Sequence, residues 1–261
     1  MNLEQVIGRS RTPPTPPGYP IGGVGVNMGG GGDDCVIIPD GYPKLPLELF
    51  CIPKVYEDCL SHIMISDGMI RDRIKHMALT IVKEYETSFK DSINLLCVLK
   101  GAFRFLGDLF NELKDIIRAR ESPLEFQLNF VRLQSYMNDK SVREPLITGL
   151  DDASEFRGKV SIFYRVINLQ DIIVVEDLVD TGRSMRALLE RLKCMQPRRV
   201  RVASLLLKRL PTGISYRPDF VGFEIPDEFV VGYALDYNEH FRDLPHICVI
   251  NQHGREKFRV H

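Results

Sequence analysis

The sequence predicts an α/β protein whose mostly parallel, twisted sheet is flanked by helices on both faces. From about residue 56 onwards, short apolar segments rich in Val, Ile and Leu alternate with longer segments whose apolar residues recur at helical spacing. Strands separated by helices favour parallel strands joined by crossover helices. The length of 261 residues is sufficient for one such domain with extensions.

The expected elements follow one another along the chain. The first helix covers 67–86, and Asp67 is its expected N-cap because an aspartate carboxylate accepts from the first free amides of a helix. The later elements are a strand at 92–101, a helix at 102–120, strands at 124–133 and 171–177, a helix at 184–195, a strand at 199–208 and a strand within 223–236. Ligands of such sheets bind at the carboxyl ends of the strands. We therefore expect Lys100, Gly101, Glu176, Asp177 and Lys208 at one edge.

The chain divides into an arm and one domain. Residues 1–33 are crowded with proline and then glycine, which predicts a disordered arm, and residues 34–261 form the folded domain. The glycine cluster at 22–32 resembles a phosphate-binding loop, but no strand precedes it, so we favour a linker.

Composition excludes several classes of function. The net charge of -1 gives no basic surface for nucleic acid, and no apolar stretch approaches the roughly 18 residues that span a membrane. The N-terminus lacks the pattern of a signal peptide, and the six cysteines are scattered, which is typical of a reduced, cytoplasmic protein. No histidine stands in a metal-ligand or nucleophile pattern with a cysteine or serine, so we assign no role to His62, His76, His240, His246 or His253.

The motif "VVEDLVDTGRSM" at 174–185 carries the strongest chemical signal. Its turn at 180–184 joins a strand to a helix, and the free N–H groups of such a turn form a cradle for a phosphate. Thr181 and Ser184 add hydroxyl donors, and Gly182 allows close approach of the backbone. Glu176 and Asp177 would repel that anion, so they should face sugar hydroxyls or a divalent cation. Together these features indicate a phosphosugar site.

These residues resemble the ribose-phosphate signature of the purine phosphoribosyltransferases. From Tyr42 to Val260 the chain is similar to the hypoxanthine-guanine branch of that family, through "LCVLKG", "FVRLQSYMND", "VASLLLKR" and "RPDFVGFEIPDEFVVGYALDYNEHFRDL". The resemblance implies the type I phosphoribosyltransferase fold, with a small hood region and a mobile lid loop. It also implies purine salvage, in which the 5-phosphoribosyl group of 5-phosphoribosyl 1-diphosphate (PRPP) passes to N9 of hypoxanthine or guanine, giving IMP or GMP and pyrophosphate.

The resemblance further implies a role for individual residues. Asp180 resembles the catalytic acid/base that shares the proton on N7 of the purine. The phosphate and ribose contacts would be Glu176, Asp177, Asp180, Thr181, Gly182, Arg183 and Ser184, and the pyrophosphate contacts Lys100, Gly101 and Arg242. The purine contacts would be Lys208 at the 6-oxo group, Phe229, Val230 and Asp236, the Mg²⁺ ligands Glu176, Asp177 and Asp236, and the lid Ser135 and Tyr136.

Lys208 also leads to an expectation about specificity. An ammonium group donates to a 6-oxo group but meets donors on the 6-amino group of adenine. We therefore expect hypoxanthine and guanine to be preferred over adenine, with no expectation for xanthine. The family resemblance also implies a homodimer or homotetramer.

The chain departs from the family at three places. Arg183 and Ser184 replace the commoner Lys and Thr, which should preserve the phosphate cradle. Ala102 replaces a second glycine after Lys100 and Gly101, whose peptide bond is expected to be cis. Residues 160–170, "VSIFYRVINLQ", are an atypical insertion of 11 residues before the signature strand. The segment is either an added hairpin or interface element, or an unspliced in-frame intron, which we favour because Val-Ser fits a splice-donor consensus and a terminal Gln fits CAG. Sequencing the transcript would decide between them.

Two other function classes stay open at this point. The chain is alternatively a catalytically weak or inactive homologue that binds nucleotide in a regulatory role, which bound nucleotide without turnover would indicate. A third class, a folding-defective product of an abnormal transcript, is suggested by the insertion alone. Asp180, Lys208, Asp236 and Arg242 favour the enzyme.

Overall fold

The computed structural model describes residues 25–26, 35–86, 92–137, 140–148, 170–211, 213 and 216–260. In chain order its elements are β1 (Gly25–Val26), β2 (Val36–Ile37), η1 (Leu47–Leu49), η2 (Lys54–Tyr56), β3 (Leu60–Ile65), α1 (Asp67–Glu86), β4 (Ile93–Leu99), α2 (Phe103–Ala119), β5 (Phe126–Met137), β6 (Lys140–Thr148), β7 (Asp171–Val179), α4 (Arg183–Lys193), β8 (Arg199–Lys208), β9 (Phe220–Ile225), β10 (Val230–Val231), β11 (Ile247–Ile250) and α5 (Gln252–Lys257).

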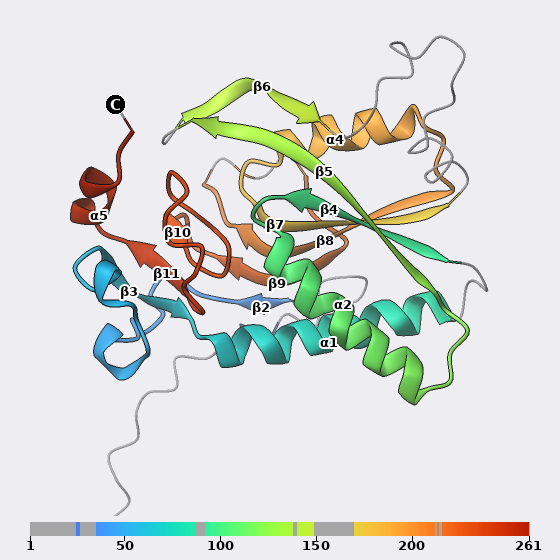
Figure 1. The fold of residues 1–261 in the computed structure, drawn as a ribbon, viewed down its shortest axis with the longest axis horizontal. Helices are drawn as coiled ribbons and strands as arrows, with labels where there is room; N and C mark the ends of the chain where they lie inside the picture. Colours follow the sequence, from blue (N-terminus) through green and yellow to red (C-terminus); the bar gives the residue numbers. More distant parts are fainter. Residues whose placement is uncertain are drawn as a thin grey trace, which may run out of the picture.

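The main sheet confirms the predicted architecture. Its eight strands lie in the order β1-β2-β9-β8-β7-β4-β5-β6 (Figure 1). The pairs from β2 to β5 are parallel, whereas β1 and β6 add antiparallel edges. The central strands β4, β7 and β8 are buried on both faces, as expected from their continuous apolar runs.

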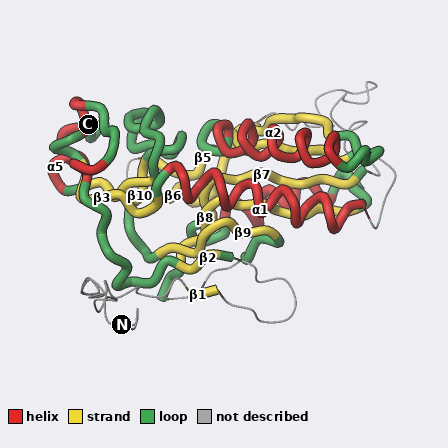
Figure 2. The backbone as a smooth tube through the Cα atoms, turned by 90° about the horizontal axis from the view of Figure 1, so that it is seen from below, coloured by secondary structure: helices red, strands yellow, loops and turns green. Residues whose placement is uncertain are grey.

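Alternate residues of the central strands pack into two separate apolar cores. On one face, Leu95 and Ile173 pack in the same apolar cluster as the buried sides of α1 and α2, which lie side by side in Figure 2. On the other face, Leu96 and Val174 pack in a cluster with Leu188 of α4. This two-sided covering fixes the register of β7, because a shift of one residue would exchange its two faces.

A second sheet forms the hood that the family resemblance implied. It contains β10, β11 and β3, all antiparallel, and lies with α5 beside one end of the main sheet in Figure 1. Its core includes Tyr56, Phe241 and Leu244. The sequence analysis did not identify β3, β6 or β11 as separate strands. β11 has four residues, and β6 carries charged residues and a proline, which are typical of an edge strand rather than a buried one.

The start of α1 differs from the prediction by one residue. Ser66, rather than Asp67, caps the helix, because its hydroxyl accepts from Met69 N at 3.5 Å and its carbonyl accepts from Ile70 N at 3.1 Å. Asp67 lies in the first turn, where its carboxylate accepts from Arg71 at 2.6 Å and from Arg104 at 3.4 Å. Both acidic and hydroxyl side chains favour this end of a helix, so the sequence alone did not separate them.

Other expectations fall largely outside the described residues. Of the predicted arm at 1–33, only Gly25–Val26 is described, as β1 paired with β2. Of the insertion at 160–170, only Gln170 is described, and its carbonyl accepts from Arg198 N at 3.0 Å. The cis peptide bond joins Leu99 to Lys100, one position before the expected bond. Within the described ranges, none of the helices combines the length and apolar character needed to cross a bilayer.

A close approach between β8 and β9 gives a prediction about stability. A methyl group on Gly222 would lie 2.5 Å from the carbonyl oxygen of Leu205, whereas one on Gly107 in α2 would meet nothing within 4 Å. We expect Gly222→Ala to lower the free energy of unfolding by about 1–3 kcal/mol through overpacking. Gly107→Ala should raise it by about 0.5–1 kcal/mol, because alanine favours a helix. Denaturant unfolding of both variants measures this, and equal stability of Gly222→Ala and the parent would contradict the packing.

Candidate active site

The carboxyl ends of β4, β7 and β8 bring the predicted residues to one edge of the sheet. Lys100 and Gly101 follow β4, the turn at 180–182 follows β7, and Lys208 ends β8. The three strands are parallel neighbours, so the predicted common edge is confirmed. β7 continues to Val179, two residues beyond the predicted strand. Glu176 and Asp177 therefore lie within the strand rather than as its last two residues.

Asp177 lies directly against the backbone of Gly101. A methyl group on Gly101 would lie 1.6 Å from Oδ2 of Asp177, so no larger residue fits here without moving that carboxylate. The other oxygen, Oδ1, accepts from Leu178 N at 2.9 Å. Burial raises the pKa of Asp177 to about 6, even though the positive charge of Arg242 acts in the opposite direction.

Glu176 is the second buried acid of β7. Its Oε2 atom is buried and has no hydrogen-bond partner among the described residues. Burial, and then the charge of Asp177, hold the pKa of Glu176 well above its usual range. A cation or a hydroxyl donor at this position would relieve that cost. The orphaned oxygen therefore fits either a hard divalent cation or a sugar hydroxyl.

The turn after β7 has the geometry of an anion cradle. Gly182 adopts a φ of 78°, the left-handed region that favours glycine, and it immediately precedes α4. The backbone N–H of Arg183 donates to Thr181 Oγ1 at 3.5 Å. Gly182 provides no side-chain cap for α4. The N-terminal amides of an α-helix carry partial positive charge. Thr181 and Ser184 are half-buried beside this turn.

Lys208 brings a buried positive charge to the acids. Its residue is 8% exposed, and its ammonium lies 3.6 Å from Oδ2 of Asp180 and 3.4 Å from Oδ1 of Asp227. The prediction that Lys208 and Asp180 share a site is consistent with this contact. Asp227 was not predicted, although its place two residues after the buried Ile225 was a signal that it ends a strand.

The hood supplies an apolar wall. Phe229 is half-buried, its ring meets Tyr237 edge-on with centroids 5.5 Å apart, and the guanidinium of Arg255 lies 5.1 Å from its centroid. Val230 is buried in β10 and pairs with Val249 of β11. Phe229 thus offers an aromatic ring held by neighbours, and Val230 offers a fixed backbone position.

The loop after β10 gathers further charges. Arg242 forms an ion pair with Asp236 at 2.8 Å and donates to the carbonyl of Ala234 at 2.6 Å. Asp236 also accepts from Glu239 N at 2.7 Å, so it caps a turn. Glu239, which the sequence analysis did not identify, contacts both Lys100 and Arg242. Its position between Asp236 and Arg242 in "DYNEHFR" was the available signal.

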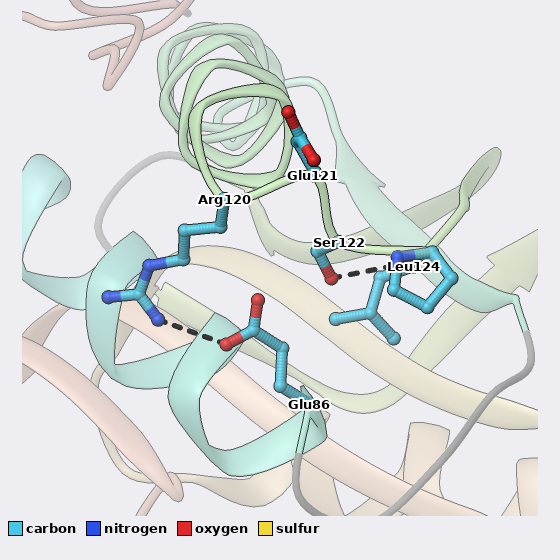
Figure 3. Close-up of a pocket in the computed structure, with 6 residues that line it drawn as sticks. Glu86, Arg120, Glu121, Ser122 and Leu124 are labelled. Carbon is cyan, nitrogen blue, oxygen red and sulfur yellow. Dashed lines mark hydrogen bonds and ion pairs between the residues drawn. The ribbon is translucent and has the colours of Figure 1, made fainter.

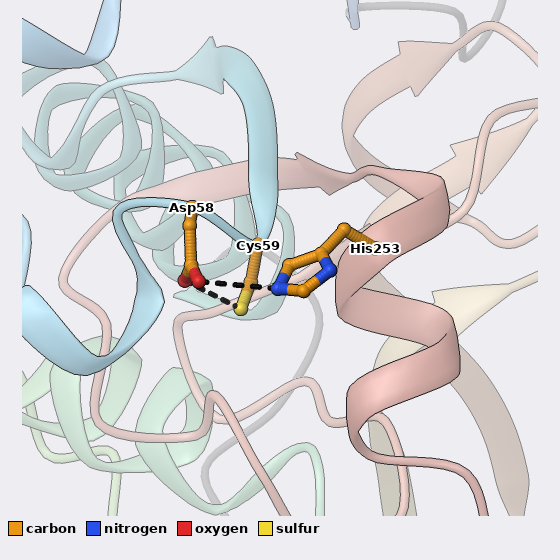
Figure 4. Close-up of side chains that lie close together, drawn as sticks. All are labelled: Asp58, Cys59 and His253. Carbon is orange, nitrogen blue, oxygen red and sulfur yellow. Dashed lines mark hydrogen bonds and ion pairs between the residues drawn. The ribbon is translucent and has the colours of Figure 1, made fainter.

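The structure does not bring the three predicted metal ligands into one compact group. In the part of the chain that is described, the one set of three His, Cys, Asp or Glu side chains with ligand atoms within 4.8 Å is Asp58, Cys59 and His253 (Figure 4). A cation shared by Glu176, Asp177 and Asp236 would therefore need bridging water or substrate oxygens, which Mg²⁺ commonly keeps.

The cluster of Asp58, Cys59 and His253 corrects an expectation. The sequence analysis found no histidine associated with a cysteine, because 194 positions separate residues 59 and 253 and only the fold brings them together. The ammonium of Lys257 lies 3.3 Å from Asp58 Oδ1 and 3.5 Å from Cys59 Sγ, so the cluster already contains a cation. Burial raises the pKa of the Cys59 thiol, which makes it a poor nucleophile. The absence of an assigned histidine nucleophile or base stays a prediction.

The predicted lid residues lie in a hairpin. Ser135 and Tyr136 are near the end of β5, where Tyr136 pairs with Ser141 of β6 and the register shifts between Gln134 and Tyr136. This places their backbone near the end of a two-stranded arm at the edge of the sheet. Their role as a lid stays a prediction.

A separate pocket lies away from these residues. It is lined by Glu86, Arg120, Glu121, Ser122, Pro123 and Leu124, between the carboxyl ends of α1 and α2 (Figure 3). Because β4 and β5 begin just after these helices, the pocket lies at the amino edge of the sheet, opposite the candidate site. Its residues include no group from the signature motif.

Comparison with known proteins identifies the same region. A family model described as a phosphoribosyl transferase domain matches residues 66–238. The chain is 48% identical over 227 residues to the hypoxanthine-guanine phosphoribosyltransferase of Schistosoma mansoni, covering 87% of this chain and 76% of that protein. Over 225 residues, 86% of this chain, it is 46% identical to phosphoribosyltransferase domain-containing protein 1 of Homo sapiens, covering 94% of that protein. Over the same length it is 43% identical to the hypoxanthine-guanine phosphoribosyltransferase of Homo sapiens, covering 97% of that protein.

A solved structure agrees with the sequence matches. The crystal structure of hypoxanthine-guanine phosphoribosyltransferase from Schistosoma mansoni in complex with IMP aligns with a TM-score of 0.71 and 42% sequence identity, covering 87% of this chain and 100% of that chain. The fold of this chain is thus similar to that of a protein that is also similar to it in sequence. This chain therefore belongs to the phosphoribosyltransferase family, in the branch that includes the hypoxanthine-guanine phosphoribosyltransferases.

Proposed function

We propose that the chain transfers the 5-phosphoribosyl group of PRPP to N9 of hypoxanthine or guanine and releases IMP or GMP with pyrophosphate. The observation that carries this proposal is the contact of 3.6 Å between the ammonium of Lys208 and the carboxylate of Asp180. A 6-oxopurine presents O6 and N7 side by side on one edge. A cation beside a proton-sharing acid matches this pair of atoms.

Each residue of the site would act on a different part of the reacting molecules. N9 of the base forms a bond to the anomeric carbon of the ribose while the bond from that carbon to pyrophosphate breaks. Asp180 would hold or accept the proton at N7. Lys208 would donate to O6, and Phe229 would stack on the ring. The fixed donors of residues 180–184 would orient the 5′-phosphate, so that the anomeric carbon is held near N9.

The groups at the opposite side of the ribose would hold the leaving group. Lys100 and Arg242 offer cationic donors for the pyrophosphate, and Asp177 and Glu176 offer acceptors for ribose hydroxyls. Glu176, Asp177 and Asp236 would hold Mg²⁺, which when bound would supply positive charge to the departing pyrophosphate. The orphaned Oε2 of Glu176 supports this assignment.

The proposal extends to the compartment and the assembly of the protein. All six cysteines are free, which favours a reducing compartment, and we infer a cytoplasmic location. The family to which the chain belongs implies an assembly of identical subunits, as the sequence analysis stated. We therefore infer a homodimer or homotetramer.

The principal test is turnover by the purified chain. With Mg²⁺ and PRPP, hypoxanthine and guanine should each yield nucleotide and pyrophosphate, adenine should react far more slowly, and chelation of Mg²⁺ should stop the reaction. Xanthine is offered in a fourth assay. The same chain without residues 160–170 is the matched control for the insertion. Nucleotide binding without turnover in both forms would favour a regulatory homologue instead.

The contact between Gly101 and Asp177 predicts a loss of catalysis. Gly101→Ala would displace the Asp177 carboxylate, because the new methyl group and Oδ2 cannot both occupy their positions. Misplacing a positioning group by about 1 Å costs on the order of 100-fold in rate. We expect kcat/KM for PRPP to fall by about that factor while the fold is retained. Gly107→Ala in α2, whose new methyl group meets nothing, is the control, and steady-state kinetics of both variants decides.

The preference for a 6-oxo group is expected to depend on Lys208. Lys208→Met removes the ammonium but keeps a long apolar side chain, so kcat/KM for hypoxanthine should fall about 10- to 100-fold, the value of a charged hydrogen bond. The ratio of hypoxanthine to adenine turnover should fall with it. Lys193→Met, which removes an exposed lysine paired with Glu190 on α4, should leave both substrates unchanged. An unaltered substrate ratio in Lys208→Met would show that another group reads O6.

A further inference from the structure

Glu239 contacts both cations that face the candidate pyrophosphate subsite. The ammonium of Lys100 lies 3.1 Å from Oε1 and 3.0 Å from Oε2 of Glu239. Nε of Arg242 lies 3.4 Å from the same Oε2. One carboxylate therefore occupies the donors of two cations, one following β4 and one in the loop after β10.

The backbone holds Glu239 at this position. Tyr237 and His240 exchange two backbone hydrogen bonds, of 3.2 and 3.1 Å, and the two residues between them have positive φ, 50° for Asn238 and 71° for Glu239. This is a tight two-residue turn of the type that favours asparagine. Asn238 donates to the carbonyl of Phe258 at 2.9 Å, and Glu239 N donates to Asp236. The carboxylate is thus presented by an anchored turn rather than by a loose segment.

The chemistry of Glu239 resembles that of the leaving group. Glu239 pairs with two cations, Lys100 and Arg242, and a glutamate side chain in such surroundings is an anion at neutral pH. A carboxylate and a diphosphate both offer paired anionic oxygens to the same kinds of donor. The two anions compete for Lys100 and Arg242, since each cation has a limited number of donors and like charges repel.

We propose that Glu239 occupies the pyrophosphate subsite of the free protein and is displaced when the diphosphate of PRPP or pyrophosphate binds. The proposal rests on the proposed function, because that function assigns Lys100 and Arg242 to the diphosphate. Glu239 thereby lowers the affinity for PRPP and for pyrophosphate by the same factor. When Glu239 pairs again with Lys100 and Arg242, it favours the release of pyrophosphate.

The exposure of the ion pairs makes this exchange feasible. The side chains of Lys100 and Glu239 are 50% and 62% exposed. Exposed pairs of this kind contribute little, so a ligand of higher charge displaces the carboxylate at modest cost.

The decisive experiment compares Glu239→Gln with Glu190→Gln. Both substitutions remove one negative charge and an exposed ion pair, but Glu190 pairs with Lys193 on α4 and has no contact with the site residues named above. Calorimetry with inorganic pyrophosphate and Mg²⁺ measures binding without turnover. Kinetics then gives KM for PRPP and for hypoxanthine separately, together with the inhibition constant of pyrophosphate.

We expect Glu239→Gln to bind pyrophosphate about two- to tenfold more tightly than the parent, the range set by two exposed ion pairs. KM for PRPP should fall by a similar factor, with KM for hypoxanthine unchanged. Glu190→Gln should match the parent in every constant. Unchanged or weaker pyrophosphate binding in Glu239→Gln would overturn the proposal.

Failure of the two proposals is distinguishable. If pyrophosphate binds and tightens in Glu239→Gln but no nucleotide forms from any purine, the inference about Glu239 holds and the proposed function fails. If nucleotide forms but neither pyrophosphate binding nor KM for PRPP responds to Glu239→Gln, the proposed function holds and the inference fails. A parent chain that binds no pyrophosphate, with Glu239→Gln equally inert, overturns the inference.

Discussion

The burial of two adjacent carboxylates in β7 is the constraint on which the rest of the site depends. Glu176 and Asp177 lie in β7 just beyond Val175, its last residue paired with β4, and although each residue is half-buried, their carboxyl groups are largely removed from water. Both are less acidic than usual because of burial. The surroundings meet this cost only in part: Gly101 leaves room for Asp177, and Arg242 adds positive charge. A ligand that brings hydroxyl donors or a cation would offset the rest of this cost. Ligand binding at this edge therefore stabilises the charged form of the two acids.

The remaining charges of the site are arranged as ion pairs that a ligand rearranges. Lys208 lies between Asp180 and Asp227, and Glu239 lies between Lys100 and Arg242. Each cation is paired with an acid while the site is free, so an anionic ligand has to exchange with that acid when it binds. The two groups act at opposite ends of the proposed reaction. One would read the purine, and the other would hold the departing pyrophosphate.

The sequence predicted the elements whose pattern is local and missed those that depend on distant partners. The apolar run of β8 was predicted with its bounds, residues 199–208, because a buried parallel strand is apolar throughout. The turn after β7 was predicted from Thr181, Gly182 and the helix that follows. The contact between Asp177 and Gly101 was not, because 76 positions separate them. Glu239 was not predicted for a related reason. Its ion-pair partner Lys100 follows another strand and lies far from it in the sequence.

The topology also separates the start of β7 from the chemistry. β7 begins at Asp171, which is fully buried and forms ion pairs with Arg198 at 3.2 Å and Arg199 at 3.9 Å. Nine residues of strand lead from there to Val179, so the two ends of β7 are roughly 25 Å apart. The chain after Gln170 therefore enters the sheet at its amino edge, where removing one member of a buried ion pair is costly. A substitution of Asp171 or Arg198 would act on the folding of this edge, and the turn around Asp180 lies at the opposite end of the strand.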